Sequence, residues 1–496
     1  MTPDNSQPKE LDVYPSPYLG GWYDVLMAAH PEIEWQAIIE TNRGCWAQCA
    51  FCFWGNALNA KYRLFSVERV SAIFSWLGRH KVKYVFNADS NFGMLPQDQW
   101  ILNALLSTHA AWGYPEKFRT CWGKNTTDKI YTMAKRLHDA GLDKGLTLSR
   151  QSQDPQTLIN VHRSNIRLDV YAALQRRANA DGVPVYSELI LGMPGETEES
   201  WERGLEELLA AGAKNQIFAY HCEILPNTAM ADPAYLAKYC VVTQRVPLQP
   251  IHCAISDAEV MEYDRISVGT ATMPPDAWRR VTVLTWLLQL FHGMKVAFYP
   301  MVYFGAWLHR PYLEFLKFCL TDAESPLLHR ELVHWEQVAD QMQQGEGRAE
   351  GWGGTWWEQE EVSFLHLMAQ RDAWGRELLG LGRRYLAALG GNLIFSENSR
   401  HAGVDAQWEE VVRFQLALLP DPLYLQDVVV PFATPLPIAL EHVLAGENPA
   451  ETCPDTPGWV RVARKPSFGD WGAYARDAIL HGRKGGTTLL PWRWEG

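Results

Sequence analysis

The sequence predicts an α/β fold, a partial (β/α)6 barrel followed by a mostly helical C-terminal region. From Glu32 to about Gly269, short β-like runs alternate with runs whose apolar residues recur at helical spacing. This alternation indicates parallel strands joined by right-handed helical crossovers. After about Pro274 the pattern changes to long helical runs rich in tryptophan. The alternation and its abrupt end therefore define the predicted architecture.

Each predicted strand is a short apolar or β-branched run. The six predicted strands cover residues 35–41, 84–87, 119–122, 145–149, 183–191 and 216–222. Apolar residues at helical spacing predict helices within 66–77, 100–106, 130–137, 170–178 and 201–209. Three glycines follow such helical runs, as C-terminal caps do: Gly141, Gly182 and Gly212. In a barrel of this kind, functional groups belong at the carboxyl ends of the strands.

These patterns divide the chain into three parts. Residues 1–31 form an N-terminal extension, residues 32–274 form the barrel, and residues 275–496 form the mostly helical, Trp-rich C-terminal region. Within the last part we expect long helices at 325–343 and 361–389. The tryptophans there are expected to form core rather than ligand contacts.

The C-terminal region contains one glycine-rich stretch and one long apolar stretch. The glycine-rich residues 345–354 predict a loop or linker. The apolar residues 281–308 are interrupted by Gln289, His292 and Lys295. A bilayer span needs about 20 predominantly apolar residues, and the longest uninterrupted apolar piece of this stretch is shorter than that. The stretch therefore predicts a buried helix followed by a strand or loop, with no membrane attachment.

Composition narrows the class of protein. The chain has 496 residues, 47% hydrophobic content and a net charge of -12. It lacks the basic excess of a general nucleic-acid-binding surface, and its polar N-terminus is unlike a signal peptide. Nine cysteines, an odd number in a long chain, favour a reducing cytoplasm over a disulfide framework.

Three cysteines carry the strongest chemical signal. Cys45, Cys49 and Cys52 are separated by three and then two residues, just after the first predicted strand. A short loop with this spacing places three thiolates on one face of an iron–sulfur cluster. A [4Fe–4S] cluster usually has four protein ligands, so three local cysteines leave one iron open for a substrate or cosubstrate. The alternative is a structural zinc site, with His80, His221 or Cys222 as fourth ligand.

Further motifs follow the predicted strands in order. Residues 87–93 read Asn-Ala-Asp-Ser-Asn-Phe-Gly, residues 146–152 Leu-Thr-Leu-Ser-Arg-Gln-Ser, and residues 188–197 Glu-Leu-Ile-Leu-Gly-Met-Pro-Gly-Glu-Thr. With the cysteine triplet, the Leu-Pro-Asn-Thr at 225–228 and the start at Tyr14, they resemble the radical SAM superfamily. The similarity covers roughly residues 14–275 and is closest to the usually cobalamin-dependent (B12-binding-like) subgroup.

The resemblance implies a cofactor site. Cys45, Cys49 and Cys52 are the implied ligands of a [4Fe–4S] cluster, whose fourth iron chelates S-adenosyl-L-methionine. Phe51 packs by the adenine, and Gly192 lets backbone approach it. Asp89, Ser90 and Asn91 hold the methionyl ammonium, while Ser149 and Gln151 contact the ribose and carboxylate. Glu188 faces either the ligand or the barrel rim, and Thr197 is explained at least as well by a helix N-cap.

The implied activity is reductive cleavage of S-adenosylmethionine to modify a small molecule or peptide in specialised metabolism. A reducing partner such as flavodoxin or ferredoxin is expected. The catalytic residues that act on the acceptor are not identified. About thirty residues precede the first strand, so we expect no cobalamin domain before the barrel, and cobalamin binding is left open.

Three more functions stay open. The layout is similar to the radical SAM enzymes of arsinothricin biosynthesis, which implies transfer of the 3-amino-3-carboxypropyl group to trivalent arsenic. In that case Cys222 and Cys253 are candidate soft ligands, although buried packing is their default. The second is C-methyl transfer with cobalamin, and the third is a non-enzymatic role as a zinc or iron–sulfur binding protein.

Overall fold

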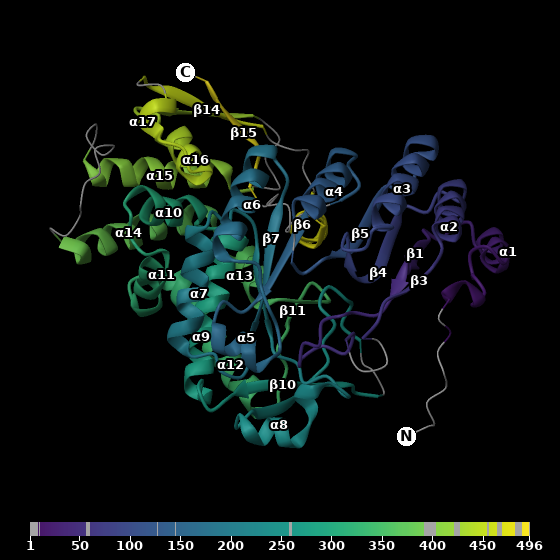
Figure 1. Cartoon of the computed structure of the whole chain (residues 1–496). Coiled ribbons are helices and arrows are strands. Elements are labelled where there is room, and N and C mark those ends of the chain that lie inside the picture. Colours follow the sequence, from purple (N-terminus) through teal and green to yellow (C-terminus); the bar gives the residue numbers. More distant parts are fainter. Residues whose placement is uncertain are drawn as a thin grey trace. The chain divides into compact units, whose positions relative to one another are not determined.

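The structure is a computed structural model of the chain (Figure 1). It describes residues 8, 10–55, 60–125, 127–143, 145–256, 260–390, 403–420, 427–453, 456–463, 469–481 and 489–495. The chain forms two compact units. The first comprises Met1–Arg150, Val161–Ile166 and Leu225–Met230, and the second comprises Gln151–Asn160, Arg167–Ile224 and Ala231–Gly496.

A parallel sheet organises the first unit. Its order is β1 (Gln36–Ile39), β4 (Tyr84–Phe92) and β5 (Lys117–Trp122). The register pairs Ile38 with Phe86, and Phe86 with Arg119. Strand β1 is an edge strand of this sheet. The remaining elements are η1 (Leu11–Val13), α1 (Trp22–Ala29), β2 (Asn42–Arg43), β3 (Arg63–Leu64), α2 (Val67–Arg79), α3 (Asp98–Trp112), α4 (Asp128–Asp139) and β6 (Leu146–Gln151), whose last residue belongs to the second unit.

Amphipathic helices cover this sheet. Helix α2 begins at Ser66, whose side chain accepts a hydrogen bond from the backbone N–H of Arg69, as an N-cap does. It buries Phe74 and Leu77. Phe74 contacts Phe118 of β5 edge to face, with ring centroids 6.2 Å apart. Aromatic pairs of this geometry stabilise a core beyond their buried area.

The second unit begins with parallel strands and continues with helices. Strand β7 (Val185–Leu191) pairs in parallel with β8 (Ile217–His221), with Ser187 opposite Ile217. Strands β9 (Val242–Pro247) and β10 (Tyr263–Gly269) form an antiparallel pair. The helices of this part are α5 (Pro155–Asn160), α6 (Leu168–Asp181), α7 (Glu198–Ala210) and α8 (Pro233–Lys238), whereas η2 (Ala229–Ala231) has only its last residue in this unit.

The C-terminal region is mostly helical. Its helices are α9 (Pro275–Leu288), η3 (Gln289–Gly293), α10 (Phe298–Val302), η4 (Tyr303–Trp307), α11 (Tyr312–Thr321), α12 (Pro326–Gln344), α13 (Gln359–Met368), α14 (Arg371–Leu389), α15 (Val404–Leu418), α16 (Leu436–Ala445), α17 (Pro449–Thr452), α18 (Trp471–Tyr474) and η7 (Ala475–His481). Two small sheets join them, β11 (Glu350–Trp352) with β12 (Thr355–Trp357), and β13 (Val428–Phe432) with β14 (Gly458–Val462) and β15 (Trp492–Glu495).

The predicted fold class is confirmed. All six predicted strands are present as β1, β4, β5, β6, β7 and β8, with ends that differ by a few residues. The loop predicted at 345–354 is wrong in part, because β11 and the start of the β11–β12 hairpin lie in it. Tryptophans 278, 335 and 374 are fully buried, as expected for core residues. The domain boundary at 274 stays a prediction.

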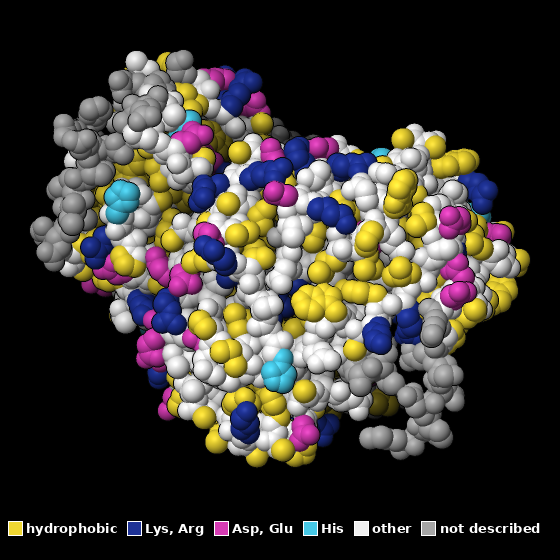
Figure 2. Space-filling model, in the orientation of Figure 1, with side chains coloured by type: hydrophobic (Ala, Val, Ile, Leu, Met, Phe, Trp, Pro, Cys, Tyr) yellow, Lys and Arg dark blue, Asp and Glu magenta, His cyan; other side chains and the backbone are white. Residues whose placement is uncertain are grey.

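The apolar stretch from Val281 to Leu308 is almost entirely buried. Among the described helices, none is by itself long and apolar enough to cross a membrane. One pair passes that test together, Pro275–Gly293 with Phe298–Trp307, and it is bent by 103°. On the face shown in Figure 2, Lys and Arg side chains are scattered among Asp and Glu.

A buried carboxylate fixes the turn after β4. Asp98, at the start of α3, accepts hydrogen bonds from the backbone N–H groups of Gly93 (2.7 Å) and Leu95 (2.9 Å). Burial outweighs these bonds and raises the pKa of Asp98 to about 7. Because its folded pKa exceeds its unfolded value, the carboxyl favours folding at low pH, and this contribution is lost as pH rises through about 7.

We therefore expect the stability of the wild type, relative to Asp98→Asn, to fall between about pH 4 and pH 7. At about 1.4 kcal/mol per pKa unit, the total change is on the order of 4 kcal/mol. Urea unfolding of the full chain at several pH values measures it. Asp139→Asn, at an exposed side chain, is the matched control. A pH-independent difference between the wild type and Asp98→Asn would contradict the prediction.

Candidate functional site

The cysteine loop is closed at its base by a short antiparallel pair. Asn42 of β2 lies opposite Leu64 of β3, and Arg43 lies opposite Arg63. The loop therefore leaves and returns at neighbouring points beside the carboxyl end of β1. Gly44 has φ of 111°, a left-handed conformation that favours glycine, at the turn before the first cysteine.

The loop folds back on its own backbone. Cys45 and Cys49 are buried and Cys52 is partly exposed, and the Cys52 N–H donates to the Cys49 carbonyl at 3.0 Å. A Cβ at Gly55 would lie 1.7 Å from the carbonyl oxygen of Ala47. Glycine is therefore the residue that this close backbone contact admits.

Two other segments of the first unit hold the middle of the loop. The Ala50 N–H donates to the carbonyl of Val161, and the Met230 N–H donates to the carbonyl of Ala50, both at 2.9 Å. Ala50 and its neighbour Phe51 are thus fixed by backbone bonds between distant parts of the sequence. Phe51 is half-buried.

Hydrogen-bond donors lie beside two of the cysteine sulfurs. The side-chain amide of Asn91 lies 3.2 Å from Cys45 Sγ and 3.2 Å from the hydroxyl of Tyr62. The ammonium of Lys124 lies 3.9 Å from Cys49 Sγ. Such donors stabilise negative charge on sulfur, as a thiolate or an iron–sulfur cluster requires.

Ser90 and Asn91 therefore contact the cysteine loop, and their contact with a methionyl ammonium stays a prediction. The Ser90 hydroxyl donates to the carbonyl of Gly44 at 2.7 Å, and the Asn91 amide also reaches Ser90 Oγ at 3.1 Å. The sequence does not single out Tyr62. Burial is the main cause that raises the pKa of the Tyr62 hydroxyl, and the charge of Cys45 raises it further.

Asp89 is fully buried, and its carboxylate is hydrogen-bonded to the chain just after β1. Its carboxylate accepts hydrogen bonds from the Thr41 N–H (2.8 Å), the Thr41 hydroxyl, the Asn42 N–H (3.2 Å) and the Asn87 amide (3.0 Å). Burial raises its pKa, although these donors oppose the shift. Asp89 thus links the end of β1 to β4 by hydrogen bonds. Its contact with a methionyl ammonium stays a prediction.

Ser149 lies within β6, in the part of this strand that belongs to the first unit. Its carbonyl accepts a hydrogen bond from the guanidinium of Arg163. Arg150, the next residue, is buried and donates to the carbonyl of Ile166 at 2.5 Å. The segment 161–166 therefore holds both this strand end and, through Val161, the cysteine loop.

The remaining predicted contacts belong to the second unit. Gln151 has φ of 65°, and Glu188 of β7 is half-buried opposite Phe218. Gly192 has φ of 93°, and its carbonyl accepts a hydrogen bond from Ser267 Oγ at 2.9 Å. A Cβ at Gly192 would lie 3.3 Å from Trp278 Nε1, so the chain passes close to that indole.

Two residues next to Gly192 have structural roles. Glu196 is buried and accepts hydrogen bonds from Ser152 (2.5 Å) and Ser200 (2.9 Å). Burial raises its pKa to about 7. Thr197 is the N-cap of α7 and forms a reciprocal capping box with Ser200. The helix-start interpretation of Thr197 is confirmed.

Among the candidate zinc and arsenic ligands, His80 has other partners, His221 and Cys222 are withdrawn from solvent, and Cys253 is exposed. His80 lies 2.9 Å from the Trp76 carbonyl through Nδ1 and 3.0 Å from Asp24 through Nε2, and it stacks on Trp76. Burial raises the pKa of Cys222 to about 12 and lowers that of His221 to about 3. Cys222 is therefore a protonated thiol near neutral pH, whereas the Cys253 side chain is exposed.

The donor set of the cysteine loop fits an iron–sulfur cluster in its chemistry. Three thiols lie on one loop, and an amide and an ammonium point at two of them. In the described part of the chain, no group of three or more His, Cys, Asp or Glu side chains is arranged to hold a single metal ion. The fit therefore rests on ligand type and on the donors around the sulfurs.

Comparison with known proteins gives no matching family model. The chain is 36% identical, over 288 residues, to the cobalamin-dependent radical SAM methyltransferase TokK of Streptomyces tokunonensis, covering 58% of this chain and 42% of TokK. It is 37% identical, over 278 residues, to 2-(S-pantetheinyl)-carbapenam-3-carboxylate methyltransferase of Streptantibioticus cattleyicolor, covering 56% of this chain and 40% of that enzyme. The chain thus spans about two fifths of the length of these curated relatives.

Among solved structures, the radical S-adenosylmethionine methyltransferase TsrM of Kitasatospora setae, with tryptophan and a SAM analogue bound, matches with 16% identity and a TM-score of 0.41. The matched region covers 53% of this chain and 53% of the TsrM chain. The stronger similarity is in the sequence, at 36–37% identity over more than half of the chain. The resemblance that the motifs predict, to radical SAM proteins of the cobalamin-type subgroup, is therefore confirmed.

Proposed function

We propose that this chain is a radical SAM transferase of specialised metabolism that uses a [4Fe–4S] cluster on Cys45, Cys49 and Cys52. The observation that carries the proposal is the placement of Asn91 and Lys124 at the sulfurs of Cys45 and Cys49. The sequence similarity to two methyltransferases supports the same chemistry. When bound, such a cluster supplies an electron to the sulfonium of S-adenosylmethionine at its open iron.

The chain's own residues hold the cysteine loop in place and set the charge around its sulfurs. The Asn91 amide and the Lys124 ammonium stabilise negative charge on the sulfurs, while Ser90 fixes the backbone of Gly44. Asp89 holds Thr41 and so sets where the loop leaves the sheet. In the first unit, the proposed cosubstrate contacts are Phe51, Asp89, Ser90, Asn91 and Ser149.

Methyl transfer to a small molecule is the favoured reaction. Both curated relatives are methyltransferases, and TokK is cobalamin-dependent, so cobalamin belongs in the assay. Aminocarboxypropyl transfer to arsenic is less favoured, because both curated relatives are methyltransferases and one of the two candidate arsenic ligands, Cys222, is buried. An electron donor such as flavodoxin or ferredoxin and a reducing cytoplasm complete the proposal.

The deciding experiment is product analysis. The full chain is purified without oxygen, reconstituted with iron and sulfide, and incubated with S-adenosylmethionine, a reductant and cobalamin. We expect mass spectrometry to detect 5′-deoxyadenosine and S-adenosylhomocysteine. 5′-Methylthioadenosine would instead indicate aminocarboxypropyl transfer. Zinc in place of iron, or an intact cosubstrate, would overturn the proposed function.

Gly55→Ala tests the geometry of the loop. Since the new Cβ would meet the Ala47 carbonyl at 1.7 Å, the backbone must move and the cysteines with it. We expect the variant to lose most of its iron after reconstitution while its far-ultraviolet circular dichroism is retained. Gly403→Ala, where a Cβ meets nothing within 4 Å, is the matched control. Equal iron content in the two variants would contradict the proposed role of Gly55.

Lys124→Met tests the charge beside Cys49. Removing a cation near a cluster disfavours the more negative reduced state, so we expect a more negative reduction potential with iron content maintained. Lys129→Met, at an exposed lysine that contacts the Leu95 carbonyl, is the control. An unchanged potential in Lys124→Met would remove this lysine from the environment of the cluster.

A further inference from the structure

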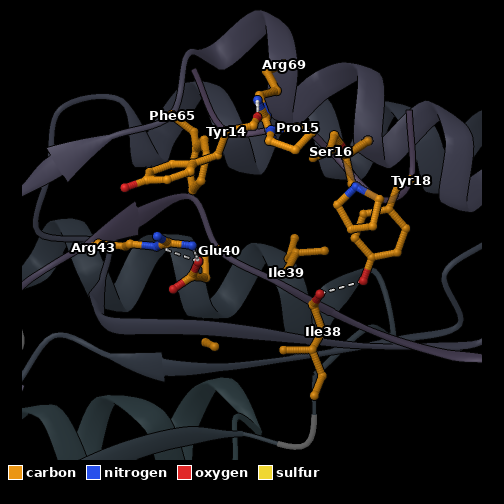
Figure 3. Close-up of a pocket in the computed structure, with 13 residues that line it drawn as sticks. Tyr14, Pro15, Ser16, Tyr18, Ile38, Ile39, Glu40, Arg43, Phe65 and Arg69 are labelled. Carbon is orange, nitrogen blue, oxygen red and sulfur yellow. Dashed lines mark hydrogen bonds and ion pairs between the residues drawn. The ribbon is translucent and has the colours of Figure 1, made fainter. Parts of the chain in front are cut away.

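A cavity of about 350 Å³ lies in the first unit, lined by residues 14–18 of the N-terminal segment and by residues at the end of the edge strand β1 (Figure 3). This volume is within the range of small-molecule sites. None of the proposed cluster ligands or cosubstrate contacts lines it. The lining residues are Tyr14, Pro15, Ser16, Pro17, Tyr18, Ile38, Ile39, Glu40, Arg43, Phe65, Arg69, Ile73 and Ala88.

One side of the cavity carries two guanidinium groups and one carboxylate. Arg43 donates to Glu40 through Nε and Nη2, both at 2.8 Å. Arg69 donates through Nη1 to the Tyr14 carbonyl at 2.6 Å, while its Nε is buried and has no acceptor among the described residues. Two cations against one anion leave this side with a net positive charge.

An aromatic ring separates the two guanidinium groups. The Phe65 ring centroid lies 5.9 Å from Arg43 Cζ and 4.9 Å from Arg69 Cζ. The Tyr14 ring lies 5.1 Å from Arg43 Cζ. These cation–π contacts hold both arginines in place, so little side-chain freedom remains to be lost when a ligand binds.

The other wall is apolar. In Figure 3, Tyr18 lies across the cavity from Arg43 and Glu40, and Ile39 lies between them. The Tyr18 hydroxyl donates to the Ile38 carbonyl at 2.5 Å, and burial raises its pKa to about 12. Tyr18 is therefore neutral near pH 7 and offers its ring, with Ile39 and Ile73, to an apolar group.

We propose that this cavity is a binding site for a small organic carboxylate with an apolar body. The carboxylate meets Arg43, whose planar guanidinium group matches carboxylate geometry, and Arg69 on the other side of Phe65 adds to the positive charge of this wall. The body lies against Tyr18, Ile39 and Ile73. The site is separate from the proposed cluster and does not depend on the proposed function.

Isothermal titration calorimetry of the full chain with three matched probes tests the ligand class. The probes are 4-phenylbutyrate, 4-phenylbutan-1-ol and 4-phenylbutylamine, which share a body and differ in the charge of the head group. We expect the carboxylate to bind about tenfold more tightly than the alcohol, and the amine most weakly. Binding of the amine equal to or tighter than that of the carboxylate, or binding of no probe, would overturn the proposal.

Two variants locate the site. Arg43→Gln removes one cation, and Ala88→Leu fills part of the cavity; each is expected to weaken 4-phenylbutyrate binding about tenfold. Arg79→Gln, at an exposed arginine of α2 outside the cavity, is expected to bind like the wild type. A melting curve checks that each variant is folded. If Ala88→Leu, folded, binds the carboxylate as tightly as Arg79→Gln does, the assignment of this cavity is wrong.

Discussion

The hydrogen bonds between the carboxylate of Asp89 and the chain at Thr41 and Asn42 are the constraint on which the candidate site depends. They join the ends of β1 and β4, two strands that are neighbours in the sheet but 48 residues apart in sequence at this point. The cysteine loop starts only three residues beyond Thr41. Because the donors surround a fully buried carboxylate, losing one partner would leave a buried polar group unsatisfied, which is costly.

The carboxyl end of β4 also places polar side chains beside the cysteine sulfurs. Two successive side chains of β4 have different partners. Asp89 is buried against the backbone, whereas the Ser90 hydroxyl donates to the Gly44 carbonyl. Asn91 then reaches Cys45, and Lys124, which follows β5, reaches Cys49. Parallel strands with a common carboxyl edge thus collect polar groups from distant segments around one loop.

The strands were predictable from sequence because their apolar runs and capping glycines are local signals. The pairs β2–β3 and β11–β12 were not, since strands of two or three residues leave no periodicity to detect. The place of Ser90 and Asn91 after a strand marks them as candidate site residues, but it does not predict their contacts with Gly44 and Cys45. Tyr62 and the cavity at Arg43 have no local sequence signal, because both depend on contacts between residues that only the folded chain brings together.

The direction of a side chain was also beyond the sequence. Asp89 sits in a motif that suggests a ligand contact, yet its oxygens face Thr41, Asn42 and Asn87. His80 has the chemistry of a zinc ligand, but Trp76 and Asp24 occupy its two nitrogens. In both cases residue type alone does not name the hydrogen-bonding partner, and the contact of Asp89 with a cosubstrate stays a prediction.

The backbone anchors of the cysteine loop bear on the order of events in maturation. Ala50 is held by Val161 and Met230, and both bonds are made by backbone atoms, so they belong to the folding of the chain itself. Part of the entropy cost of ordering that stretch is therefore offset by folding. Zinc fingers differ, because their metal capture and folding are one step.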